Sequence, residues 1–245
     1  MRWSFLAPLV IVGLGILAVT GMPTSALALS FHDNFTPSPS PLWNNYSGNW
    51  TASGGMYYPQ VPNNNPYAVS SLPFDLTDLT VSVTVNDLAD GGVFLHSDGT
   101  NNNGILLVLG GNDYGQGTRG GNAGSSIYWH VVQNGVTGPK LDETTGVFTP
   151  GATYDIRATV SGNTYSAFIN GSSTAATTLS DSTFPDGRVG LYGDQPNTTT
   201  GAGFGAPTSF SNFDLQGTEV PEPTSVLLLG TALGGLGILR RRSEA

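Results

Sequence analysis

The chain has 245 residues, a formal net charge of -9 and no cysteine. Between Leu29 and Gly217 fourteen Asp or Glu residues stand against four Lys or Arg residues, and these few cations are scattered. Binding a phosphate backbone requires clustered cations, so the composition excludes nucleic acid as a partner. With the two apolar ends set aside, about 190 residues remain, enough for one domain that buries a core without disulfides.

The first segment has the pattern of an export signal. Met1-Arg2 precedes an apolar run from Phe5 to Val19, and small residues follow at Ala26 and Ala28. A short apolar run followed by an A-x-A pattern is typical of a signal peptide, here residues 1–28, which signal peptidase cleaves after Ala28. The alternative is an uncleaved membrane anchor, which the shortness of the run disfavours.

The middle of the chain, residues 29–217, alternates apolar and polar side chains with the period of half-buried strands, most clearly over 79–86 and 153–160. Ser161-Gly162-Asn163 and Asn170-Gly171 predict turns on either side of a further strand, and therefore an antiparallel meander. Other strands are expected at Met56–Val61, Ala68–Leu72, Gly92–Ser97, Ile105–Leu109, Ser126–Gln133, Arg188–Tyr192 and Ser209–Leu215. Many short strands with Gly, Pro and Asn between them predict an all-β, antiparallel two-sheet sandwich of the jelly-roll type.

Two loops contain the hard oxygen donors that calcium prefers. Asp98 and Asn101 lie in the first loop, and Asp194 and Asn197 lie in the second. Their carboxylate and amide oxygens make calcium a candidate cofactor. The alternative is that these residues form ordinary Asx turns, since neither loop has the EF-hand pattern.

The long glycine-rich loop from Gly110 to Ser125 is the candidate ligand-binding segment. Polar side chains beside an aromatic ring suit a sugar, whose apolar face stacks while its hydroxyls form hydrogen bonds. The alternative is a loop that binds nothing. The residues that would contact the ligand are Asp113, Tyr114, Gln116, Arg119 and Asn122.

The usual catalytic groups are not evident. The one glutamate between residues 29 and 217, Glu143, lies in a stretch, Lys140–Thr145, that we interpret as a loop carrying a solvated charge. The three histidines have no metal-ligand spacing, and the sequence contains no G-x-S-x-G pattern. A glycosidase requires two carboxylates across the scissile bond, and no spacing singles out a pair of aspartates. The sequence therefore predicts a non-catalytic domain.

The last segment combines a proline-rich motif, an apolar stretch and a basic cluster. Pro221-Glu222-Pro223 is followed by an apolar stretch at about 224–239 and by Arg240-Arg241-Arg242. At ~1.5 Å per residue, the fourteen uncharged residues from 226 to 239 span ~21 Å of the ~30 Å hydrocarbon core. Such a helix spans a membrane only marginally. The arginines favour the cytoplasmic side, so the preceding domain is expected outside.

These terminal residues resemble the PEP-CTERM family of sorting signals, which here covers residues 218–245. The resemblance implies that an exosortase recognises Pro221, Glu222 and Pro223 and processes the protein after transient insertion into the inner membrane. It also implies a Gram-negative host that makes extracellular polysaccharide, and a final location at the cell surface or in the extracellular matrix.

The domain itself resembles the concanavalin A-like lectin/glucanase superfamily, laminin G-like domains included. The stretches that carry this resemblance are Trp50–Gly55, Gly91–His96, Tyr154–Arg157, Phe168–Gly171 and Gly190–Tyr192. The sequence lacks the Glu-x-Asp-x-x-Glu motif of the glucanase branch. The resemblance implies a fold and not an activity. Together with the acidic composition, the long loop and the sorting tail, it leads us to expect a non-catalytic, lectin-like domain that binds polysaccharide. An enzyme on this fold and a purely structural surface component are the alternatives. The resemblance also implies that the first strand, around Phe31–Phe35, lies beside the last, around Phe210–Leu215.

Overall fold

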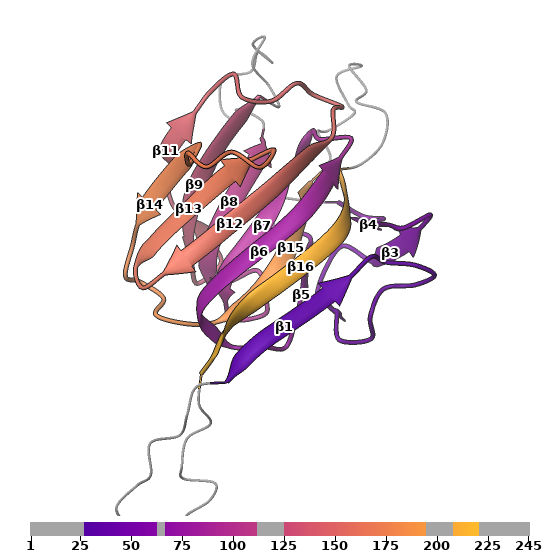
Figure 1. Cartoon of the computed structure of the whole chain (residues 1–245), viewed down its shortest axis with the longest axis horizontal. Coiled ribbons are helices and arrows are strands. Elements are labelled where there is room, and N and C mark those ends of the chain that lie inside the picture. The colour runs from indigo at the N-terminus through magenta and orange to yellow at the C-terminus, as the bar shows by residue number, and fades with distance from the viewer. Residues whose placement is uncertain (1–26, 63–66, 112–124, 195–207, 221–245) are drawn as a thin grey trace, which may run out of the picture. The chain divides into compact units, whose positions relative to one another are not determined.

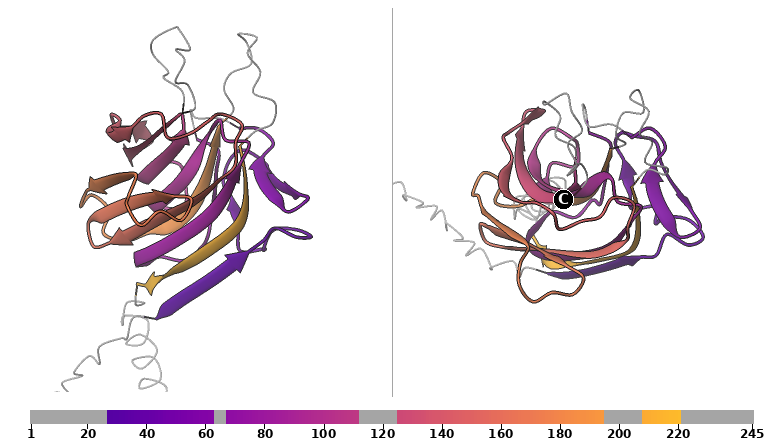
Figure 2. Two further views of the ribbon diagram at one scale, coloured as in Figure 1. Left: turned by 45° about the horizontal axis from the view of Figure 1, so that its top comes forward. Right: turned by 90° about the horizontal axis from the view of Figure 1, so that it is seen from above.

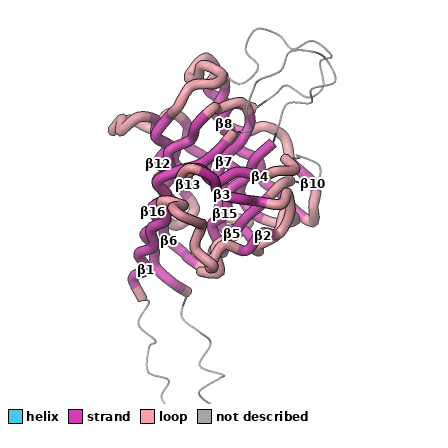
Figure 3. The backbone as a smooth tube through the Cα atoms, turned by 90° about the vertical axis from the view of Figure 1, so that its right-hand side faces the viewer, coloured by secondary structure: helices cyan, strands magenta, loops and turns pink. Residues whose placement is uncertain are grey.

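The computed structural model describes residues 27–62, 67–111, 125–194 and 208–220, all within one compact unit, Ala26–Pro221. The regular elements in these ranges are strands, as Figure 3 shows. Among the residues described, no helix is long and apolar enough to cross a membrane. The strands form two antiparallel sheets that pack face to face, which confirms the predicted two-sheet sandwich.

The front layer in Figure 1, sheet A, contains in spatial order β14 (Thr177–Ser180), β13 (Thr164–Ile169), β12 (Tyr154–Ser161), β6 (Leu76–Asn86), β16 (Ser209–Glu219), β4 (Met56–Pro59) and β3 (Trp50–Ser53), and β1 (Ala28–Asp33) pairs with β16. The layer behind it, sheet B, contains β10 (Val136–Thr137), β9 (Ser126–Gln133), β8 (Gly104–Gly110), β7 (Asp90–Ser97), β15 (Arg188–Asp194), β5 (Val69–Ser71) and β2 (Asn44–Asn45), and β11 (Leu141–Thr144) pairs with β9. Figure 2 shows the two layers from above.

Alternation along the strands places one face of each sheet in a shared core. In β6 the apolar side chains at 79, 81, 83 and 85 are buried, whereas the polar side chains between them are partly exposed. Trp129 of β9 is fully buried, and its indole N–H donates a hydrogen bond to Thr177 Oγ1 of β14 at 3.1 Å. A buried aromatic side chain removes 150–250 Å² from water, so the tryptophans contribute strongly to the core.

The predicted meander is confirmed by the pairing of β12 with β13 and of β13 with β14. After β13 the chain turns through Asn170 and Gly171, which have φ angles of 50° and 72°. The amide of Ser172 donates to the carbonyl of Ile169 at 3.1 Å and closes this turn. Positive φ at both central residues defines the turn type for which Asn-Gly is preferred.

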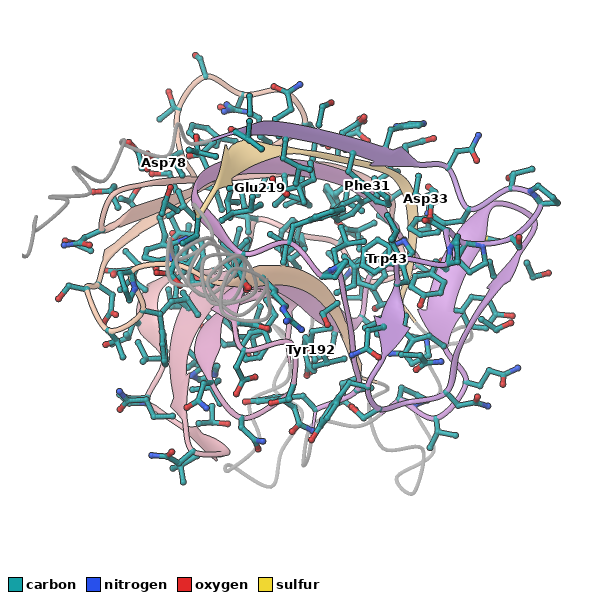
Figure 4. The ribbon with its side chains drawn as sticks, turned by 90° about the horizontal axis from the view of Figure 1, so that it is seen from below. Phe31, Asp33, Trp43, Asp78, Tyr192 and Glu219 are labelled. Atoms are coloured by element: carbon teal, nitrogen blue, oxygen red, sulfur yellow. The ribbon has the colours of Figure 1, made fainter. Side chains whose placement is uncertain are left out.

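The first and last strands lie side by side, as predicted. β1 pairs antiparallel with β16, with Phe31 opposite Leu215 and Asp33 opposite Phe213. Asp33 is buried, and its carboxylate accepts three hydrogen bonds: from the Phe35 and Ser40 amides at 2.7 Å each, and from Trp43 Nε1 at 2.9 Å. Figure 4 shows Asp33 and Trp43 close together. These bonds fasten the segment after β1 to the core.

The prediction of a loop over Lys140–Thr145 is wrong, because β11 lies there and pairs with β9. Leu141 is opposite Trp129, but the register shifts before Thr144 and the intervening Asp142 has a φ of 51°. Asp142 and Glu143 are adjacent and both exposed, so the sequence here lacks the alternation of apolar and polar residues that would have indicated a strand. The short strands β2, β3, β10 and β14 were not predicted either.

Several predicted features lie outside the described residues. They are the signal peptide up to Ala26, the sorting motif Pro221-Glu222-Pro223, the apolar stretch 224–239 and the basic cluster Arg240–Arg242. The predicted cleavage point falls at the boundary of the unit, since Ala28 is the first residue of β1 and pairs with Thr218. The two ends of the described unit are therefore adjacent.

Candidate functional site

The outer face of sheet B, which points away from the shared core, is apolar. Because side chains alternate along a strand, Phe94 points outward while its neighbours Val93 and Leu95 enter the core. An antiparallel sheet usually presents a polar outer face, so an apolar one indicates a further role. The buried residues of this outer cluster are Tyr67, Val69, Phe94, Leu106, Val108, Tyr128, Val132 and Tyr192.

Contacts between the two opposite edges of sheet B cover part of this face. The Tyr67 hydroxyl, next to β5, forms a hydrogen bond with Thr137 Oγ1 of β10 at the other edge of the sheet. The loop after β7 reaches the same place, because Asn101 Nδ2 donates to the Tyr67 carbonyl at 3.1 Å. Ser71 Oγ of β5 donates to the Gly99 carbonyl of this loop at 3.1 Å. The loop and the strand edges therefore cover the apolar face.

Two buried aspartates extend this cluster at one end of the sheet. Asp90 begins β7 and Asp194 ends β15, and the pairing of these strands places the two residues directly opposite each other. Their exposed fractions are only 3% and 4%. Side chains directly opposite in an antiparallel pair have Cβ atoms about 4.5–5.5 Å apart, so the two carboxylates are neighbours.

Two tyrosines adjoin the aspartates and keep their protons at neutral pH. The Tyr192 hydroxyl donates to Asp90 Oδ1 at 3.2 Å. Burial raises the pKa of Tyr192 well above its ordinary value, and the charges of Asp90 and Asp194 raise it further. Burial likewise raises the pKa of Tyr67 against the lowering effect of its bond to Thr137, and the same two aspartates add to the rise. The site thus combines aromatic rings, hydroxyl donors and carboxylate acceptors.

The candidate ligand-binding loop begins and ends at this site. Gly110 of β8 pairs with Ser126 of β9, and Gly111 lies against the Tyr128 ring. A Cβ at position 111, where φ is +67°, would lie 2.3 Å from the Tyr128 hydroxyl oxygen, so only glycine fits. The predicted ligand-contacting residues Asp113, Tyr114, Gln116, Arg119 and Asn122 themselves lie outside the described residues.

The two candidate calcium loops are at opposite ends of β7, because Asp98 follows this strand and Asp194 pairs with its first residue. Asp98 Oδ1 accepts a hydrogen bond from the Thr100 amide at 2.8 Å, which is the Asx turn given above as the alternative to calcium binding. Asp98 Oδ2 accepts from Asn103 Nδ2, also at 2.8 Å. Burial alone would raise the pKa of Asp98, but the hydrogen bonds from the Thr100 hydroxyl, from Asn103 and from the Thr100 amide, together with the charge of Arg188, outweigh it and lower the pKa. Asn197 is outside the described residues, and within the described ranges no three His, Asp or Glu side chains gather around a possible metal position.

A basic group borders the cluster near β11. Lys140 Nζ lies 4.5 Å above the centre of the Tyr128 ring and 3.5 Å from Glu143 Oε1. The His130 ring is 5.2 Å from that of Tyr128. Burial lowers the pKa of His130 and outweighs the raising effect of its hydrogen bonds to backbone carbonyls, so this side chain is neutral at pH 7. Glu143 is exposed and lies away from the two aspartates in the sheet.

Comparison with known proteins shows the fold. No protein-family model and no curated protein matches this sequence. Carbohydrate binding module CBM66 from Bacillus subtilis is 14% identical over 70% of this chain and 93% of that chain, with a TM-score of 0.53. A Bacillus subtilis protein of unknown function with a galectin-like fold is 11% identical over 80% of this chain and 97% of that chain, with a TM-score of 0.52. A glycosidic hydrolase is 11% identical over 81% of this chain and 99% of that chain, with a TM-score of 0.50.

The domain therefore has the concanavalin A-like lectin/glucanase β-sandwich fold. Solved structures that share it include both a carbohydrate-binding module and a hydrolase, so the fold alone does not decide between binding and catalysis.

Sequence reasoning missed the pair of aspartates, since the two residues are far apart in the chain. A weak signal was present, because Tyr192 and Asp194 are two residues apart and must share one face of a strand. The sequence does not show that β15 pairs with β7, and therefore does not show that Asp194 lies opposite Asp90.

Proposed function

We propose that this chain is an exported surface or matrix protein whose lectin-like domain binds a neutral polysaccharide without cleaving it. The single observation that supports this proposal most strongly is the cluster of Tyr67, Tyr128 and Tyr192 beside Asp90 and Asp194 on the outer face of sheet B. Aromatic rings pack against the apolar faces of sugars, and carboxylates accept hydrogen bonds from their hydroxyls.

A neutral ligand fits the charge of this site best. Two neighbouring carboxylates repel an anionic sugar, whereas hydroxyl groups can donate to them. Because both aspartates are buried, binding must open this end of the face. We therefore expect slow association, with a rate constant below the usual ~10⁵ M⁻¹s⁻¹ for recognition that needs no conformational change.

A second candidate function is glycoside hydrolysis, which the pairing of Asp90 with Asp194 favours. Retaining glycosidases have two carboxyl groups about 5–5.5 Å apart, a separation within reach of two directly opposed aspartates whose Cβ atoms are about 4.5–5.5 Å apart. We favour binding because one member of such a pair must act as the acid and the other as the nucleophile, in contrasting environments. Here both carboxylates are equally buried beside the same tyrosine.

The export and sorting part of the proposal rests on the sequence. We infer that a signal peptide is removed after Ala28, and that an exosortase recognises Pro221-Glu222-Pro223 while the apolar stretch after it is inserted in the inner membrane. The adjacent ends of the unit are compatible with this, because cleavage after Ala28 leaves Leu29 paired with Gly217. Changing Pro221-Glu222-Pro223 to alanines should leave unprocessed protein in the inner membrane, and normal processing of that variant would exclude the exosortase.

The binding proposal is tested by affinity electrophoresis of the purified protein in gels that contain neutral polysaccharides. At least one polysaccharide should retard the protein. Asp194→Asn should weaken retardation about tenfold, because it removes a charge-assisted hydrogen bond. Asp186→Asn makes the same change of charge in the loop between β14 and β15 and is the matched control. Mobility that no polysaccharide changes would refute the proposal.

The enzymatic alternative is tested on the same polysaccharides by measuring reducing sugar ends. We expect none above the level of the Asp90→Asn variant. Release of sugar that is lost in both Asp90→Asn and Asp194→Asn would establish the hydrolase and overturn the non-catalytic assignment.

A further inference from the structure

A second polar site lies on the outer face of sheet A, on the opposite side of the sandwich from the site proposed above. It is a groove of about 340 Å³ over β12, β6 and β16. The polar side chains that line it come from all three strands and are Ser82, Thr84, Asp155, Arg157, Asn212 and Asp214. Each of them belongs to the described part of the chain.

A β-bulge in β16 shapes this groove. The register between β16 and β6 shifts between Ser211 and Asp214, and Asn212 within the shift has a φ of 49°. Bulges re-aim side chains, and asparagine tolerates this left-handed conformation better than most residues. Asn212 Nδ2 donates to Thr84 Oγ1 at 3.4 Å, and Thr84 Oγ1 donates to Asp155 Oδ1 at 2.8 Å. These two bonds connect the three strands and orient the polar groups.

The groove carries charges of both signs, with Asp155 and Arg157 on its β12 side and Asp214 on its β16 side. The Arg157 guanidinium stacks 3.8 Å from the centre of the Phe168 ring and donates to the Ser172 carbonyl at 3.5 Å. On the other side, Asp214 Oδ1 lies 2.8 Å from His32 Nδ1. Arg157 and Asp214 are both opposite Ser82, one strand away on either side. With strands ~4.8 Å apart, their Cα atoms are about 10 Å apart.

The chemistry of this groove selects a neutral, hydroxyl-rich ligand. Asp155 and Asp214 outnumber Arg157, which disfavours an anion. A metal ion is a poor occupant, since within the described ranges no three acidic or histidine side chains come together. Sugar hydroxyls can donate to the two carboxylates and accept from the guanidinium and the Asn212 amide, so each kind of group would have a partner.

We propose that this groove is a second saccharide-binding site. The class of ligand rests on the proposed function, but the site uses different residues and a different sheet. Because sheets A and B are the two layers of the sandwich, their outer faces point in opposite directions (Figure 2). One molecule with both sites bridges two polysaccharide chains, which suits a matrix protein.

The test is an NMR titration of the ¹⁵N-labelled protein with neutral hexasaccharides, namely cellohexaose, laminarihexaose and maltohexaose. At least one should shift the amide signals of Thr84 and Asn212. Asp155→Asn and Asp214→Asn keep the side-chain shape, and each should weaken this binding about fivefold while the spectrum stays that of a folded protein. The control Asp186→Asn should leave the affinity unchanged.

The outcomes separate this proposal from the previous one. Shifts at Tyr192 without shifts at Thr84 and Asn212 would overturn the second site and leave the first. Shifts at Thr84 and Asn212 alone would support the second site and count against the first. Binding at Asn212 that neither aspartate variant weakens would refute the arrangement described here, and unchanged spectra with all three sugars would overturn both sites.

Discussion

Replacing Asp33 by alanine tests how the segment after β1 is held to the core. The change removes an acceptor from three donors, the Phe35 amide, the Ser40 amide and Trp43 Nε1. The Ser40 amide is partly exposed and can bond to water, whereas Phe35 and Trp43 are buried. An unsatisfied buried donor costs about 1–3 kcal/mol, so we expect Asp33→Ala to lower the free energy of unfolding by about 3–5 kcal/mol.

Asp33→Asn gives an intermediate result, because the amide keeps one acceptor oxygen and turns an N–H group toward at least one donor. The free energies of unfolding are measured by urea denaturation followed by tryptophan fluorescence. The coupling between Asp33 and Trp43 is isolated by a double-mutant cycle with Trp43→Phe, which should give about 1–2 kcal/mol. A loss below about 1 kcal/mol for Asp33→Ala would show that these hydrogen bonds do not hold the segment.

Three further changes probe the outer face of sheet B. Gly92→Ala should lower the free energy of unfolding, measured by thermal unfolding, by more than about 3 kcal/mol. The reason is that a Cβ at this position would lie 1.9 Å from the Leu107 carbonyl oxygen. A variant as stable as the original protein would contradict this close contact. Tyr67→Phe should lower the free energy of unfolding by about 1 kcal/mol, because it removes the hydrogen bond to Thr137. Equal stability of this variant would show that the bond does not help to hold the two edges of sheet B together. Because the pKa of His130 is lower in the folded protein than in the unfolded chain, neutral His130 contributes to the free energy of unfolding. This contribution is complete above about pH 6.5, the unfolded-state pKa, and is lost as the pH falls toward the folded-state pKa. His130→Gln should therefore lessen the loss of stability on acidification, and an unchanged pH profile would refute this.

Local pattern was sufficient to predict most of the fold. Alternation in β6 and β12 and the Asn170-Gly171 turn depend on neighbours in the sequence, so these strands could be predicted without knowing their partners. The antiparallel pairing of β1 with β16 was expected from the resemblance and is confirmed. β11 could not be predicted, because it is an irregular edge strand whose side chains alternate poorly.

The candidate sites could be predicted only in part, because each of them depends on pairing between distant strands. The loop 110–125 was singled out by its composition, and the structure places its two ends beside Tyr128. Asp90 and Asp194 become a pair only when β7 lies against β15, and the groove over β6 exists only with the bulge at Asn212. Neither arrangement leaves a short motif in the sequence.

The most direct test of the proposed function is a crystal structure of the protein with a neutral oligosaccharide of the polysaccharide that retards it. We predict an intact sugar at the end of sheet B where β7 and β15 meet, with a ring against Tyr128 or Tyr192 and a hydroxyl donating to Asp90 or Asp194. A sugar that binds elsewhere and leaves these residues untouched would contradict the assignment of the site. A cleaved oligosaccharide would contradict the conclusion that the domain binds without catalysis.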